Sequence, residues 1–345
     1  MTDTEYMLDQ LQKVLAIDSP TGFTRDAARY VYEEYKALGF APQYTAKGGV
    51  LVCVSEGEPG CGEGAVLLEA HLDTLGGMVA GVKPDGRLRV TPLGGMNANN
   101  AETENVRVVT RAGRVLEGTA QLANASVHVN ADYSKTERNW NTLEVVLDEE
   151  AYTADEVRAL GVMAGDVVCF DPRTRVTAGG YIKSRFLDDK LSVAILLGYA
   201  RWLKHSGAVT RRRVYQHITV FEEVGHGGAA SFPADVTEVL SVDMGCVGEG
   251  LACRETQVSI CAKDSGGPYH YDVVSALVAA AQRAGVDFAV DVYLFYGSDA
   301  EAGLKAGHDV RHGLIGAGVY ASHGYERSHV KGMENTFALL KAYLG

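Results

Sequence analysis

Histidine and carboxylate side chains follow four apolar runs of the chain, each at the point where the run ends. The runs have the composition of buried β-strands and lie at 65–70, 218–221, 239–242 and 314–322. Because the carboxyl ends of parallel strands meet at one edge of a sheet, ligand crevices form there. The side chains that we expect at this edge are His71 and Asp73, Glu222 and Glu223, Asp243, and His323.

Two adjacent aspartates, Asp188 and Asp189, open a helix predicted at 189–204 and complete the set. Imidazole and carboxylate groups bind zinc, cobalt or manganese, and one carboxylate can bridge two such ions. Metal ions bring the pKa of a bound water near 7, and hydrolysis then needs a base, which a Glu-Glu pair can supply. The pattern therefore predicts a hydrolase with two divalent metal ions, although each short motif alone also occurs without function.

Taken in order, these motifs resemble those of the tetrahedral (TET-type) dinuclear metallo-aminopeptidases, a glutamyl aminopeptidase-like family sometimes labelled endoglucanase. The resemblance spans nearly the whole chain. The matching segments are His71-Leu-Asp73, 186–189 (FLDD), 221–225 (FEEVG), Val242-Asp243 and Ser322-His323, together with 165–172 (GDVVCFDP) and 297–300 (GSDA).

The resemblance implies a role for each candidate residue. Five side chains would be metal ligands: His71 and Asp243 for one ion, Glu223 and His323 for the other, and Asp188 as the bridge. Glu222 would act as the general base or acid, and Asp73 would orient His71, as the imidazoles of metal sites require.

Four positions limit what the resemblance carries over. The sequence alone does not separate Asp188 from Asp189 as the bridge. Thr74 and Lys190 stand where the family commonly has Glu and Arg. Neither change removes a ligand, but the substrate preference of the family's best-known members is not carried over.

The pattern of elements predicts an α/β fold with a mixed, mostly parallel sheet sandwiched by helices, as in zinc peptidases. Helix patterns, including 24–39, 273–284 and 334–344, alternate with short apolar runs, including one near 291–295. A β-rich section interrupts them, so we expect a discontinuous catalytic domain, 1–77 and 181–345, with an inserted all-β domain, 78–180. By resemblance, the insert is a dimerisation domain and the dimers build a homo-oligomer, a hollow dodecamer.

Charge and cysteine content restrict the partners and the compartment. The 345 residues hold 32 Lys and Arg against 44 Asp and Glu, a net charge of −12, which argues against nucleic acids and anionic membranes as partners. The chain shows no secretory signal and no apolar run long enough to span a membrane. Six scattered cysteines without a C-x-x-C motif indicate free thiols in a reducing cytoplasm.

The function that these observations favour is a metal-dependent aminopeptidase acting on short peptides. Three alternatives stay open: a related metal-dependent deacylase or carboxypeptidase, a glycosidase using paired carboxylates, and an inactive scaffold of the same fold. The side-chain preference and the native metal are left open too, as are the roles of His226, His308 and His312.

Overall fold

The computed structural model describes residues 1–345. The chain divides into two compact units, one formed by residues 1–73 and 173–345 and the other by residues 74–172. These divisions fall four and eight residues before the boundaries at 78 and 181 that the sequence suggested.

The first unit is built on a twelve-stranded mixed sheet whose centre is parallel. The four central strands, in spatial order, are β12 (Val214–Thr219), β3 (Ala65–His71), β13 (Val236–Val242) and β17 (Arg311–Tyr320), and each is parallel to its neighbour. Their carboxyl ends therefore share one edge of the sheet. The other strands are β1 (Gln43–Tyr44), β2 (Val50–Ser55), β10 (Arg175–Val176), β11 (Tyr181–Ser184), β14 (Gly245–Val247), β15 (Val258–Lys263), β16 (Phe288–Val292) and β18 (Glu326–His329).

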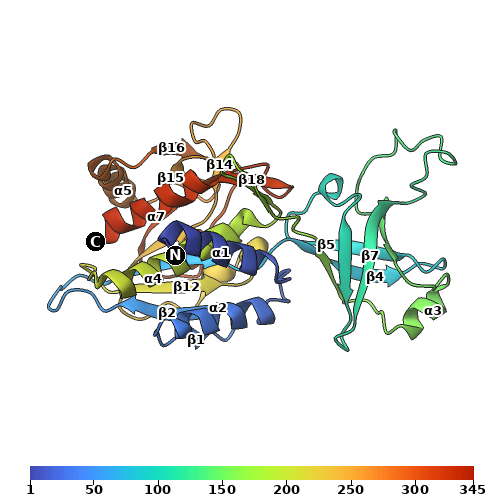
Figure 1. The fold of residues 1–345 in the computed structure, drawn as a ribbon, viewed down its shortest axis with the longest axis horizontal. Helices are drawn as coiled ribbons and strands as arrows, with labels where there is room; N and C mark the ends of the chain where they lie inside the picture. Colours follow the sequence, from blue (N-terminus) through green and yellow to red (C-terminus); the bar gives the residue numbers. More distant parts are fainter. The chain divides into compact units, whose positions relative to one another are not determined.

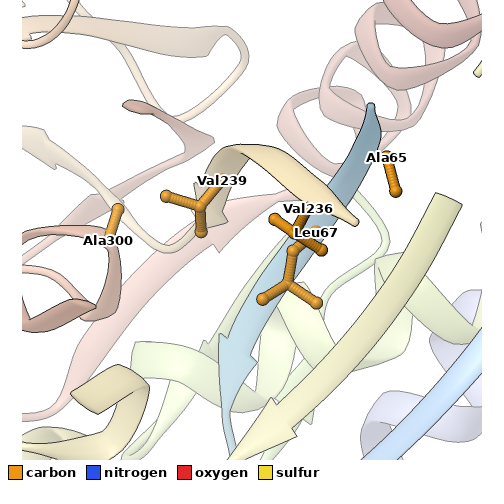
Figure 2. Packing of buried hydrophobic residues seen from close by; sticks show 5 residues of the cluster. All are labelled: Ala65, Leu67, Val236, Val239 and Ala300. Carbon is orange, nitrogen blue, oxygen red and sulfur yellow. The ribbon is translucent and has the colours of Figure 1, made fainter. Parts of the chain in front are cut away.

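Helices cover both faces of this sheet, as the sequence predicted (Figure 1). On one face, α4 packs on β3, and the Gln216 side-chain amide of β12 donates to the carbonyl of Leu196 in α4. On the other face, Ala300 of α6 packs against Leu67 and Val239 (Figure 2). The helices are α1 (Asp3–Leu15), α2 (Arg25–Ala37), α4 (Leu187–Ser206), α5 (Tyr271–Ala284), α6 (Asp299–Lys305) and α7 (Val330–Leu344).

The second unit is a closed antiparallel barrel in the strand order β4-β5-β8-β7-β6-β9. Burial alternates along β7, which is typical of a strand with one face toward a core. The elements are β4 (Gly76–Val82), β5 (Leu88–Leu93), β6 (Asn105–Val109), β7 (Val115–Leu122), α3 (Ala154–Ala159), β8 (Leu143–Leu147) and β9 (Val167–Phe170). The prediction of an all-β insert is thus confirmed at the level of fold class, apart from the short α3.

The predicted strand near 291–295 is wrong in its position, because β16 ends at Val292. The next residue, Tyr293, is buried, and its hydroxyl lies 2.5 Å from the Ser259 hydroxyl and accepts the Cys246 N–H. Phe295, by contrast, is 96% exposed. The chain therefore leaves the sheet earlier than its apolar run suggests. None of the helices in this structure has the length and apolar character needed to cross a membrane.

Candidate metal centre

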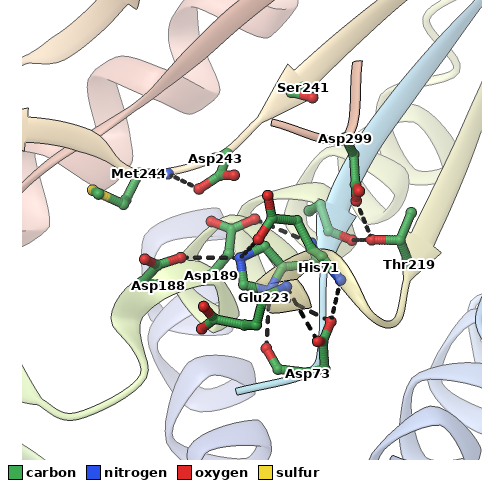
Figure 3. A network of polar contacts seen from close by, with 12 residues as sticks. His71, Asp73, Asp188, Asp189, Thr219, Glu223, Ser241, Asp243, Met244 and Asp299 are labelled. Atoms are coloured by element: carbon green, nitrogen blue, oxygen red, sulfur yellow. Dashed lines mark hydrogen bonds and ion pairs between the residues drawn. The ribbon is translucent and has the colours of Figure 1, made fainter. Parts of the chain in front are cut away.

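His71, at the end of β3, holds one ring nitrogen ready to bind a metal. Its Nδ1 lies 2.9 Å from the carbonyl oxygen of Asp73. Because a carbonyl only accepts hydrogen bonds, Nδ1 carries the hydrogen, and Nε2 is left as the ligand atom. This Nε2 lies 3.0 Å from Oδ1 of Asp188 (Figure 3).

The Asp188 carboxylate lies between two imidazoles. Its Oδ1 faces His71, and its Oδ2 lies 3.4 Å from Nε2 of His323. The same His323 nitrogen is 3.8 Å from Oε2 of Glu223. Two ligand atoms that each lie about 2.0–2.2 Å from one zinc ion are roughly 3–3.5 Å apart. The spacings around Asp188 are close to this range on both sides.

Asp189 is joined to Asp188 by a cis peptide bond, and its side chain makes a different contact. Its Oδ2 accepts the backbone N–H of His71 at 3.2 Å. Ligand atoms of His71, Asp189 and Asp243 all lie within 4.8 Å of one another, as do those of His71, Asp188 and Glu223. The predicted ligands therefore come together, and Asp189 joins them as a further candidate that the sequence considered only as an alternative bridge.

Asp73 supports the site in a different way from the one expected. Its backbone carbonyl, not its carboxylate, receives the His71 Nδ1–H, since the nearest carboxylate oxygen lies 3.8 Å from Nδ1. The carboxylate instead accepts the backbone N–H groups of Glu222 and Glu223, at 3.1 and 3.4 Å, and the Thr21 hydroxyl at 2.7 Å. Asp73 thus fixes both the tautomer of His71 and the 3₁₀ turn that carries the two glutamates.

Glu222 lies at the edge of this group and faces an open cavity. Its Oε2 is 3.7 Å from Nε2 of His71. Together with Asp188, Glu223, Asp243 and His323, it lines a cavity of about 480 Å³. A carboxylate in this place can exchange a proton with a molecule that occupies the cavity.

Glu326 is a supporting residue that the sequence analysis missed. This buried side chain of β18 accepts the Asp188 N–H at 3.1 Å through one oxygen and the His323 N–H at 3.0 Å through the other. It therefore ties together two candidate ligands that are 135 positions apart in the chain. No sequence signal marks it, because Glu326 stands between Tyr325 and Arg327 and follows no long apolar run.

Asp299 supports the loop that follows the two glutamates. Its carboxylate accepts the Gly228 N–H and the Thr219 hydroxyl, as Figure 3 shows for Thr219. A Cβ atom on Gly227 would lie 2.4 Å from an oxygen of this carboxylate, so the loop needs glycine there. The sequence predicted a family match at 297–300 but not this role of Asp299.

Buried negative charge is in excess at the site. Burial raises the pKa of Glu222 and Glu223 well above the usual range, and raises that of Asp243 to about 7. Burial would also raise the pKa of Asp188, but its contacts with His323 and His71 hold it below the usual range. Divalent cations would compensate this charge, so the oxygen and nitrogen donors fit a metal centre.

The other histidines in question lie outside this group. His226 is exposed and stacks on Phe221 at 5.2 Å, and His308 stacks on Phe232 at 4.1 Å. His312 lies 3.6 Å from Glu301.

Lys190, one of the two departures from the family pattern, is buried. Its Nζ donates to the carbonyl of Ile17 at 2.7 Å.

Comparison with protein families identifies a match over residues 49–339 to the M42 glutamyl aminopeptidase family. The chain belongs to this family. This M42 enzyme is therefore a metal-dependent aminopeptidase. It is 39% identical over 344 residues to the putative aminopeptidase YhfE of Bacillus subtilis. This match covers 100% of this chain and 99% of YhfE. It is also 23% identical over 265 residues to a glutamyl aminopeptidase of Lactococcus lactis, covering 72% of each chain.

Solved structures show the same fold for this M42 enzyme. A TET1 peptidase from Pyrococcus horikoshii superposes with a TM-score of 0.84 at 23% identity, covering 97% of this chain and 98% of the other. An aminopeptidase from the archaeon Desulfurococcus kamchatkensis gives a TM-score of 0.87 at 23% identity, covering 99% and 95%. The family assignment and the fold agree with the resemblance seen in the sequence.

Proposed function

We propose that this enzyme removes the first residue of short peptides at a centre holding two divalent metal ions bridged by Asp188. The observation that carries the proposal is the Asp188 carboxylate, whose two oxygens face the imidazoles of His71 and His323 at 3.0 and 3.4 Å. A carboxylate that faces two ligand groups in this way is what a shared site for two ions requires.

The ligand sets that we propose follow the sequence prediction. His71 and Asp243 would hold one ion, Glu223 and His323 the other, with zinc, cobalt or manganese as the candidates. Two residues support the geometry: Asp73 fixes the His71 tautomer, and Glu326 holds Asp188 beside His323. Asp189 lies close enough to His71 and Asp243 to contribute to the first ion as well.

The chemistry would be hydrolysis of the first peptide bond with Glu222 as the general base. When bound, the ions lower the pKa of water and polarise the carbonyl group of the substrate. Glu222 takes a proton from the attacking water, whose oxygen forms the new bond to the carbonyl carbon. The C–N bond then breaks, and Glu222 passes its proton to the departing amine. Asp73 orients Glu222 through the backbone N–H that it accepts.

Assembly and compartment are parts of the same proposal. We expect a homo-oligomer built from dimers that pair through the insert, and a dodecamer as its final form. Exposed apolar side chains of the insert, such as Val127 and Val129, support an interface there, and a P. horikoshii TET1 structure is described as a dodecamer. The six free cysteines favour a reducing cytoplasm.

A direct test compares wild type and Glu222→Gln on aminoacyl anilides and on their N-acetylated counterparts, with and without a chelator. We expect chelation to abolish turnover and added metal to restore it. The variant should lose at least about 100-fold in kcat. It should keep its metal, as measured by elemental analysis. Turnover of acetylated substrates at the same rate would indicate a deacylase instead. Activity that survives chelation would contradict the proposal.

A further inference from the structure

The cavity beside the candidate metal centre has two chemically different parts. Five of its lining residues, all named above, are candidate ligands or the proposed base. The remaining side chains that line it are uncharged, and the large ones are Met244, Cys246, Phe295 and Tyr296. No lysine or arginine lines the cavity.

The uncharged wall is rigid where it meets the protein core. Tyr296 and Cys246 pack against a buried cluster that includes Tyr293 and Leu314. The Tyr296 hydroxyl donates to the Met244 carbonyl at 2.9 Å, so its hydrogen is already used within the protein. The wall presents mainly aromatic and sulfur-containing surface to whatever enters the cavity.

Charge on an incoming side chain would find no partner on this wall. A carboxylate would lie beside Asp188, Glu222, Glu223 and Asp243, and no lysine or arginine lines the cavity to pair with it. An ammonium group would face carboxylates that are already committed to the proposed metal ions and to proton transfer. Burial of a charge without a partner is strongly unfavourable, whereas apolar surface gains from leaving water.

From this wall, and resting on the proposed function, we infer that the enzyme prefers peptides whose first residue is neutral and apolar, of the leucine, methionine or phenylalanine class. The curated relatives include a glutamyl aminopeptidase of Lactococcus lactis and a lysyl aminopeptidase of Pyrococcus furiosus. In this chain, the uncharged wall offers no charged group that would favour a glutamyl or a lysyl side chain.

The first test measures kcat/KM of the metal-loaded enzyme for leucyl, methionyl, phenylalanyl, glutamyl and lysyl 4-nitroanilides, which share one leaving group. We expect the apolar substrates to exceed the glutamyl and lysyl substrates by about 100-fold or more. Equal or better turnover of the glutamyl or lysyl substrate would overturn the inference and leave the proposed peptidase chemistry intact.

A charge placed on the wall supplies the second test. Phe295 is 96% exposed, so Phe295→Arg adds a cation to the cavity wall without disturbing the core. The ratio of glutamyl to leucyl kcat/KM should rise about 10-fold in this variant, and the ratio of lysyl to leucyl should fall. Leu294→Arg is the matched control, because Leu294 is 71% exposed and does not line the cavity. Identical ratios in the two variants would show that the wall does not contact the first side chain.

Binding separates this inference from the proposed chemistry. Calorimetry with the metal-loaded Glu222→Gln protein would compare free leucine, glutamate and lysine. Preferential leucine binding without turnover by wild type would support the apolar wall and contradict the proposed reaction. Absence of both binding and turnover would overturn the two together.

Discussion

At the scale of single residues, hydrogen bonds to the backbone decide which atoms are available for chemistry. The Asp73 carbonyl fixes the hydrogen of His71 on Nδ1, and the Asp73 carboxylate holds the turn that carries Glu222 and Glu223. The sequence predicted that these residues lie at the site, because each follows an apolar run. It did not predict which part of Asp73 makes which contact, since that depends on atoms brought together by folding.

Glu326→Ala should weaken the metal centre, because the buried N–H groups of Asp188 and His323 lose their acceptors. We expect metal affinity or activity to fall about 10–100-fold, a range typical for residues that orient ligands. Metal affinity is measured by competition with a chelator, and folding by circular dichroism.

Glu326→Gln is the conservative control for this prediction. It keeps one carbonyl oxygen as an acceptor and should recover part of the affinity. Unchanged affinity in a folded Glu326→Ala protein would show that the bridge between Asp188 and His323 does not matter.

The buried thiols should resist modification at moderate pH. Burial raises the pKa of Cys253 and of Cys261 to about 12, so about one thiol in ten thousand is ionised at pH 8. A disulfide reagent should react first with the half-buried thiols of Cys53, Cys61 and Cys246, and with Cys253 and Cys261 only slowly until the protein unfolds. Cys61→Ser should reduce the amplitude of the fast phase, and a rate that rises with pH should mark the slow phase. Rapid reaction of all six thiols would contradict the burial described here.

At the scale of elements, four parallel strands explain why distant residues meet. β12, β3, β13 and β17 end at one edge of the sheet, and the candidate ligands follow these ends or the start of α4. Such strands were predictable because strands covered on both faces form continuous apolar runs. The end of β16 was not predictable from the sequence, since the burial of Tyr293 depends on its contact with Ser259 from another strand.

Gly316 of β17 lets the backbone of Asp243 approach closely. A Cβ atom at position 316 would lie 1.6 Å from the Asp243 carbonyl oxygen, so Gly316→Ala must displace one of the two strands. We expect a loss of about 1–3 kcal/mol in stability and a weaker metal site. Thermal unfolding and metal content measure the two effects. Gly248→Ala, where a Cβ atom meets nothing within 4 Å, should change neither. A Gly316→Ala protein with wild-type melting and metal content would refute this account.

At the scale of the whole molecule, the proposed assembly makes a prediction about mass. Light scattering should give twelve times the mass of one chain, and dilution should release dimers before monomers if the insert is the pairing surface. Val129→Asp, which places a charge on a side chain that is 74% exposed in the isolated chain, should lower the mass without unfolding the barrel. A monomeric mass for the wild-type enzyme would contradict the proposal.

The order of the strands has a consequence for synthesis on the ribosome. β17 lies at the centre of the large sheet between β13 and β18, yet it is among the last strands in the chain. The barrel, by contrast, uses only residues 74–172 and can pair all its strands much earlier. Until residue 320 has emerged, β13 has no partner on its β17 side, and the imidazole of His323 is still missing as well. If His323 is a metal ligand, as we propose, the metal centre is therefore complete only after residue 323 has been added to the growing chain.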